Sequence, residues 1–167
     1  MSLVEVQYHP LLFSTMALLA MTELGLTAYL INAGNEHNSF PSEKYQALLI
    51  TYCFAASWTT LFSATYIIWF FDKSGHLLAN IASSVAWLLA SAILWGATSG
   101  LMHFARPGGN CARQPTLSIC RQMLAVEALG WTECGVIFLT AFATCFWMYA
   151  SRRMTKQVAG ESATRLV

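Results

Sequence analysis

The chain has 167 residues, of which 56% are hydrophobic and only 10% are charged. A water-soluble domain of this size carries roughly a quarter charged residues, so this composition excludes a soluble globular protein. The formal net charge of +1 gives no strong field of either sign and does not indicate a nucleic-acid partner.

Long apolar stretches fill most of the chain and predict its fold class. Each is about 23 residues or longer, enough for a helix rising ~1.5 Å per residue to cross a hydrocarbon core of ~30 Å. We therefore expect an all-α integral membrane protein, a four-transmembrane-helix antiparallel bundle that forms a single domain over residues 1–167. The expected helices cover about residues 11–33, 47–71, 77–104 and 123–150, and a polar tail follows at 151–167.

Proline and glycine positions suggest where these helices begin and end. The first helix is expected to start after Pro10 and to stop near Gly34. The short segment 72–75 makes the second and third helices an antiparallel hairpin. The segment 106–109, with one proline and two glycines, ends the third helix.

The basic residues near the helix ends predict the orientation in the membrane. An even number of spans puts both termini on one side. The basic cluster after the fourth helix favours the cytosol for that side, so the loop between the third and fourth helices would face outward. The basic residues are Lys73, Arg152, Arg153, Lys156 and Arg165 on the side of the termini and Lys44, Arg106, Arg113 and Arg121 on the other.

Small residues recur at helical spacing in the second and third helices. Apolar side chains gain little by associating within lipid, so small residues that let backbones approach closely favour helix contact. Two interpretations remain open: packing inside one bundle, or a face for a dimer or larger oligomer. The residues are Ala92, Gly96 and Gly100 in the third helix and Ala56, Thr60 and Ala64 in the second.

Two of the five cysteines, Cys111 and Cys120, lie in the polar loop before the fourth helix. If that loop faces outward, the secretory pathway would oxidise the pair to a structural disulfide. A redox-active pair is the alternative, but it needs the Cys-x-x-Cys spacing, which this chain lacks. Cys53, Cys134 and Cys145 are interpreted as apolar fillers, with palmitoylation of Cys145 as an alternative.

Carboxyl groups within the apolar stretches are costly and therefore suggest a function. Glu23 lies near the middle of the first helix, Glu133 within the fourth, and Glu127 nearer the outer end of the fourth. Glu127 is expected to pair with Arg121 or Arg106. Glu23 and Glu133 have no basic residue at matching depth, so we expect them to be neutral or hydrogen-bonded, with Thr27, Thr60, Ser63 and Thr132 as candidate partners. Interhelical hydrogen bonding, contact with a polar lipid or partner, and a proton or ion relay are the open alternatives.

The four histidines all lie in loops or at helix ends. Haem-binding bundles need histidine pairs that face one another between helices. The sequence therefore predicts no haem, no metal and no other cofactor, apart from a bound lipid or sterol.

The loop and the start of the fourth helix carry the run Cys111 … Cys120-Arg121-Gln122-x-x-Ala125-Val126-x-Ala128. With four spans in a short chain, this run resembles the MARVEL domain family, in particular its small fungal members of the non-classical export protein type. The resemblance implies a plasma-membrane, secretory or endosomal protein of a eukaryote with cytosolic termini. It also implies a disulfide between the two loop cysteines, with Arg121 and Gln122 at the outer start of the fourth helix.

The predicted function is that of a membrane-organising scaffold or accessory subunit rather than an enzyme. It would act by lateral association with lipids, with copies of itself or with a larger membrane complex, in microdomain organisation or trafficking. The alternative is a small transporter or channel in which Glu23 and Glu133 form a proton or cation path.

Overall fold

The structure is a computed structural model that describes residues 3–37, 40–72, 81–106, 111, 115 and 118–164. Within these residues the regular structure consists of four α-helices and no strand. Helix α1 spans Leu3–His37, α2 spans Glu43–Asp72, α3 spans Ile81–Ala105 and α4 spans Ile119–Thr164.

All four helices are long and apolar enough to cross a membrane, which confirms the predicted all-helical class. A chain surrounded by lipid must satisfy its backbone groups internally, and a helix does so within one segment. The candidate spans are Pro10–His37, Glu43–Ile68, Ser84–Ala105 and Ile119–Trp147.

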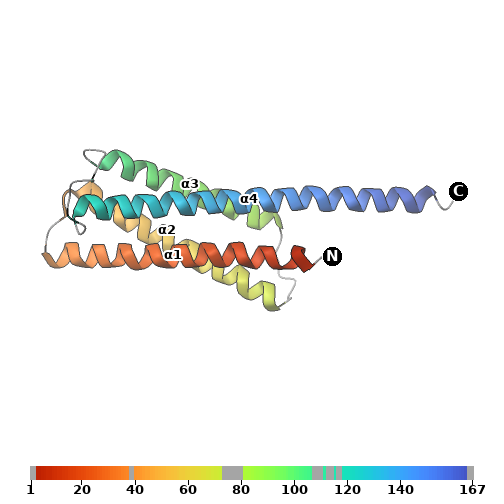
Figure 1. The fold of residues 1–167 in the computed structure, drawn as a ribbon, viewed down its shortest axis with the longest axis horizontal. Coiled ribbons are helices and arrows are strands. Elements are labelled where there is room, and N and C mark those ends of the chain that lie inside the picture. Colours follow the sequence, from red (N-terminus) through yellow and green to blue (C-terminus); the bar gives the residue numbers. More distant parts are fainter. Residues whose placement is uncertain are drawn as a thin grey trace.

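Successive helices run in opposite directions, so the molecule is an antiparallel bundle (Figure 1). Helix α1 packs mainly along α2, and α3 mainly along α4, while contacts of α1 with α4 and of α2 with α3 close the ring. The first described residue of α1 and the last of α4 lie at the same end of the molecule, which we call the termini end. The opposite end, where α4 begins, is called the disulfide end.

Several helix boundaries lie outside the expected ranges. Helix α1 runs to His37 instead of residue 33, α2 begins at Glu43 instead of residue 47, and α4 begins at Ile119 instead of residue 123. Helix α1 already begins at Leu3 and includes Pro10, and α4 continues as a helix to Thr164 instead of giving way to a polar tail at residue 151. Loss of apolar character marks the end of a membrane span but not the end of a helix, because Lys, Gln, Glu and Ala are good helix formers in water. Residues 77–80 and 165–167, predicted as part of the third helix and of the tail, lie outside the described residues.

Local bonds fix the starts of α2 and α4 at the disulfide end. The backbone N–H of Tyr45 donates to the side-chain oxygen of Ser42 at 3.2 Å, which caps α2. The N–H of Gln122 donates to the carbonyl of Ser118 at 3.1 Å, the first bond of α4. The predicted disulfide between Cys111 and Cys120 is confirmed, with a Cα–Cα distance of 5.9 Å, and it ties the loop to the first turn of α4.

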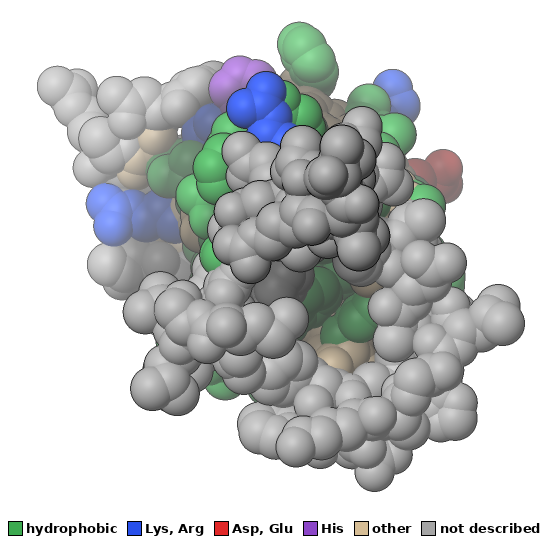
Figure 2. Space-filling view, turned by 90° about the vertical axis from the view of Figure 1, so that its right-hand side faces the viewer, with side chains coloured by type: hydrophobic (Ala, Val, Ile, Leu, Met, Phe, Trp, Pro, Cys, Tyr) green, Lys and Arg blue, Asp and Glu red, His purple; other side chains and the backbone are tan. Residues whose placement is uncertain are grey.

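Large hydrophobic side chains cover the outside of the bundle. Ile93, Phe104 and Phe142 are 73%, 87% and 73% exposed. Seen from the termini end, hydrophobic side chains form much of the described surface, with basic side chains at its upper and left margins (Figure 2). Such an exterior suits a hydrocarbon environment, because a water-soluble bundle would carry charged residues there.

Aromatic rings fill the interior of the half nearest the termini end. The ring centroids of Phe13 and Tyr66 lie 5.1 Å apart, and those of Phe62 and Trp87 lie 5.6 Å apart. These rings join α1, α2 and α3 in one apolar cluster. The middle of the bundle and the disulfide end differ in character, because polar side chains are buried there.

Candidate functional site: a polar cluster inside the bundle

Polar side chains from all four helices lie buried in the bundle interior. A buried polar group costs free energy unless it finds a hydrogen-bond partner, so each member of the cluster needs an explanation. The buried polar residues are Glu23, Thr27, Thr59, Ser63, Ser91, Thr98, Ser99, Glu127, Glu133, Thr140 and Thr144.

Glu23 of α1 and Glu133 of α4 are the most unusual members. Each is only 1% exposed, and the carboxyl groups are close enough for their charges to interact. Neither oxygen of either group has a hydrogen-bond partner among the described residues. The two helices therefore bring together two acidic groups that nothing in the described part of the chain neutralises.

The hydroxyl partners that the sequence suggested for these carboxyl groups are not bonded to them. Thr27 donates to the backbone carbonyl of Glu23 at 2.8 Å, not to its side chain, and Thr132 donates to the carbonyl of Ala128 at 2.8 Å. The hydroxyls of Thr60 and Ser63 are buried without a partner. None of these four candidate hydrogen bonds is therefore present. For Thr27 and Thr132 the reason is that a threonine inside a helix readily bonds to the carbonyl four residues before it.

Tyr52 of α2 and Ser99 of α3 form a hydrogen bond across the centre of the bundle. The tyrosine hydroxyl lies 3.1 Å from the serine hydroxyl, and both residues are fully buried. Tyr52 is near enough to interact electrostatically with both Glu23 and Glu127. The pair therefore lies between the acidic centre and the polar groups of the disulfide end.

Trp95 of α3 is also anchored by a polar contact. Its indole N–H donates to the hydroxyl of Thr59 of α2 at 3.0 Å, and neither side chain is exposed. The ring also meets Tyr52 edge-on, with centroids 5.8 Å apart. The sequence interpretation missed Tyr52, Ser99, Trp95 and Thr59. Tyr52 and Trp95 could have indicated these hydrogen bonds, because the polar atoms of buried tyrosine and tryptophan usually find a partner.

Glu127 takes part in an ionic cluster where α3 ends. Its Oε2 accepts from Nε of Arg106 at 3.0 Å, and its Oε1 lies 2.7 Å from Nδ1 of His103. The side chains of Glu127 and Arg106 are only 8% and 6% exposed, whereas that of His103 is 59% exposed. The sequence suggested Arg121 or Arg106 as the partner of Glu127, and Arg106 is the bonded one. The contact with His103 was not predicted, because the histidines were considered only as possible haem ligands.

The small residues separate into inward and outward groups. Ala56 and Ala92 are buried, and Thr60 and Ala64 are partly buried. A Cβ atom placed on Gly96 would lie 3.7 Å from Sγ of Cys134 on α4, so Gly96 faces a neighbouring helix. A Cβ atom on Gly100 would meet nothing within 4 Å. The outward group comprises Gly100 together with the exposed Ala86, Ala90 and Ala97.

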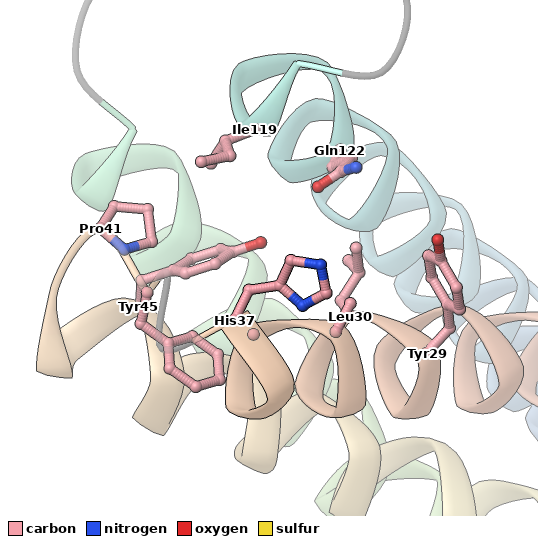
Figure 3. Close-up of a pocket in the computed structure, with 10 residues that line it drawn as sticks. Tyr29, Leu30, His37, Pro41, Tyr45, Ile119 and Gln122 are labelled. Atoms are coloured by element: carbon pink, nitrogen blue, oxygen red, sulfur yellow. The ribbon is translucent and has the colours of Figure 1, made fainter.

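A pocket of about 210 Å³ opens at the disulfide end between α1, the start of α2 and the start of α4. Tyr29, His37 and Tyr45 line it, and Gln122 of α4 closes one side, as Figure 3 shows. Arg121 and Gln122 both lie in the first turn of α4. The lining combines aromatic faces with hydrogen-bonding groups, which suits a ligand with a polar head and an apolar body.

Among the described residues, no group of three or more His, Cys, Asp or Glu side chains is arranged to hold a metal ion. Comparison of the chain with family models, with curated proteins and with solved structures finds no match. Any function must therefore be argued from the geometry of the site.

Proposed function

We propose that the chain is an integral membrane protein that organises its membrane by lateral association and acts as a scaffold or accessory subunit rather than a catalyst. Both termini would lie in the cytosol, in the plasma membrane or in secretory or endosomal membranes, as the resemblance to the MARVEL family implies. The four long apolar helices and the disulfide-closed loop support this proposal.

The observation that carries the proposal is the outward small-residue face of α3. Ala86, Ala90 and Ala97 are exposed, and Gly100 has open space where a side chain would stand. Packing within this bundle does not use these positions. In lipid, small side chains allow a second helix to approach closely, so the face suits a copy of the chain or another membrane protein.

The pocket at the disulfide end supports association with lipid. Tyr29 is 66% exposed, lines the pocket and lies in the last third of the candidate span Pro10–His37. A sterol hydroxyl or a lipid headgroup would find hydrogen-bonding groups in the pocket, supplied by Tyr29 and His37.

Native mass spectrometry of gently solubilised protein tests the outward face. We expect more than one protein copy, or a co-purifying membrane protein, and we expect Ala90→Leu and Gly100→Leu to reduce that association without unfolding the monomer. Leu139→Ile on α4 is the control and should change nothing, because it lies on another helix and replaces one large exposed residue by another. A monomer with no bound protein or lipid would contradict the proposal.

The second candidate function is a small transporter or channel, and the unpartnered Glu23 and Glu133 favour it. It predicts a proton or cation flux in proteoliposomes that Glu23→Gln abolishes. A folded preparation that binds partners or lipids but carries no flux would leave the scaffold as the better account.

A further inference from the structure

The two unpartnered carboxyl groups lie at the depth where ionised groups are most costly. Glu133 is the central residue of the span Ile119–Trp147, and Glu23 lies at the middle of the span Pro10–His37. Both side chains are almost fully buried. They are therefore far from either membrane surface if the spans cross the bilayer as their lengths allow.

Among the residues that the structure describes, none is shown to supply a counter-charge to the pair. From α2 the titratable group that interacts with Glu23 is the phenol of Tyr52, and from α4 it is Glu133 itself. Next to Glu133, the thiol of Cys134 is directed to the carbonyl of Ala92 on α3 at 3.7 Å. The guanidinium of Arg106, at the end of α3, is bound by Glu127.

Oγ1 of Thr140 on α4 lies 3.5 Å from Sδ of Met16 on α1. Glu133 and Glu23 each lie two turns from this contact toward the disulfide end, so the two glutamates are at the same level of the bundle. If both were ionised, the desolvation of each charge and their mutual repulsion would add up. Burial of an ion without a counter-charge is unfavourable in itself, and a like charge nearby makes it more so. Binding a proton removes both costs, because a neutral carboxylic acid neither repels its neighbour nor needs a counter-ion. A protonated carboxyl group also gains a donor with which it can bond to the other.

We propose that Glu23 and Glu133 form a proton-binding site at the centre of the membrane. The pair is held as carboxylic acids at neutral pH and exchanges its protons with water through the disulfide end. The proposed exchange route starts at exposed His103, which is bonded to Glu127, and passes the Tyr52–Ser99 bond on the way to Glu23. Among the described residues no hydrogen bond joins these three parts, so exchange requires the bundle to open transiently between them. Only protons are exchanged along this route, and no bond between heavy atoms changes. Proton binding at this site does not require net transport across the membrane.

Infrared spectroscopy of the protein in liposomes tests the protonation directly. We expect the carbonyl stretch of protonated carboxylic acid at neutral pH, and isotope-labelled glutamate should shift that band. Glu23→Gln and Glu133→Gln should each weaken the band, and the double variant should remove it. Glu36→Gln is the control and should leave it unchanged, because Glu36 is exposed at the end of α1. The isotope shift needs no variant, so the result stands even if a substituted protein does not fold.

Transfer to heavy water tests the exchange route. The acid band should move as protons are replaced, and Tyr52→Phe should slow that movement several-fold while leaving the band in place. Wild-type protein without the band at neutral pH would overturn the proposal. A band that never moves in heavy water would overturn the exchange route. A band abolished by sodium, lithium or potassium at constant ionic strength would show a cation site and would also overturn it.

Discussion

Gly130 of α4 lies directly against the ring of Tyr52 of α2. A Cβ atom at position 130 would stand 2.7 Å from Cε1 of Tyr52 and 2.5 Å from the hydroxyl oxygen of Ser99. Real Cβ atoms do not approach other atoms so closely, so only glycine allows α4 to lie at this distance. One position without a side chain thus allows the Tyr52–Ser99 bond to form between α2 and α3.

We predict that Gly130→Ala destabilises the bundle. The added methyl group must displace a fully buried ring, and overpacking of this kind costs about 1–3 kcal/mol. Gly135→Ala is the control on the same helix, because a Cβ atom there would meet nothing within 4 Å. Thermal unfolding in detergent should show a lower midpoint for the first variant only, and equal midpoints would contradict the contact.

Glu127→Gln should destabilise the protein far more than the same change at Glu36. Loss of the carboxylate would leave the guanidinium of Arg106 buried without its charge partner, at a cost of about 3–5 kcal/mol. Replacing both residues, as Arg106→Met with Glu127→Leu, should recover much of the loss, because no uncompensated charge remains. Unfolding of the three variants in denaturant measures this, and a mild effect of Glu127→Gln alone would show that the ion pair does not form.

Thr59→Val should lower stability by leaving the indole N–H of Trp95 without an acceptor. The substitution conserves volume, so the expected loss of about 1–3 kcal/mol reports the unsatisfied donor. Thr22→Val is the matched control, since Thr22 is exposed and bonds only within α1. A double-mutant cycle with Trp95→Phe should give a coupling energy well above zero, and additive effects would argue against the bond.

The disulfide should be detectable chemically. Alkylation of the unfolded but unreduced protein should modify Cys53, Cys134 and Cys145, and reduction should expose Cys111 and Cys120 in addition. Replacing both loop cysteines by serine should cost about 2–3 kcal/mol, the value expected from the loop-closure entropy of so short a loop. Detection of five reactive thiols before reduction would contradict the disulfide.

The long apolar stretches were sufficient to predict the helices, because a backbone in lipid has few other ways to bond its amides. The loop cysteines likewise predicted the disulfide, since their spacing and polar setting need no knowledge of the packing. The start of α1 and the end of α4 were harder to predict from sequence, because hydropathy indicates what surrounds a helix and not how far the helix extends.

The internal contacts could not be predicted from spacing alone. Gly96 and Gly100 are one turn apart in the sequence pattern, yet the first faces Cys134 and the second faces open space. Spacing places residues on one face of a helix but does not give its rotation and crossing angle against neighbours, which depend on the packing of all four helices. For the same reason, the sequence identified Glu23 and Glu133 as costly without showing that they lie near each other.

The length of α4 determines how far its C-terminal end, at Thr164, lies from the candidate span. Between Trp147, where the span ends, and Thr164 the helix rises about 25 Å at ~1.5 Å per residue. Figure 1 shows it extending well past the other three helices. Electrostatic influence of charged headgroups fades over ~8 Å at physiological salt, so the tip lies beyond their reach. A helix of this length places Thr164 well away from the end of the candidate span, where a water-soluble partner could reach it without approaching the lipid.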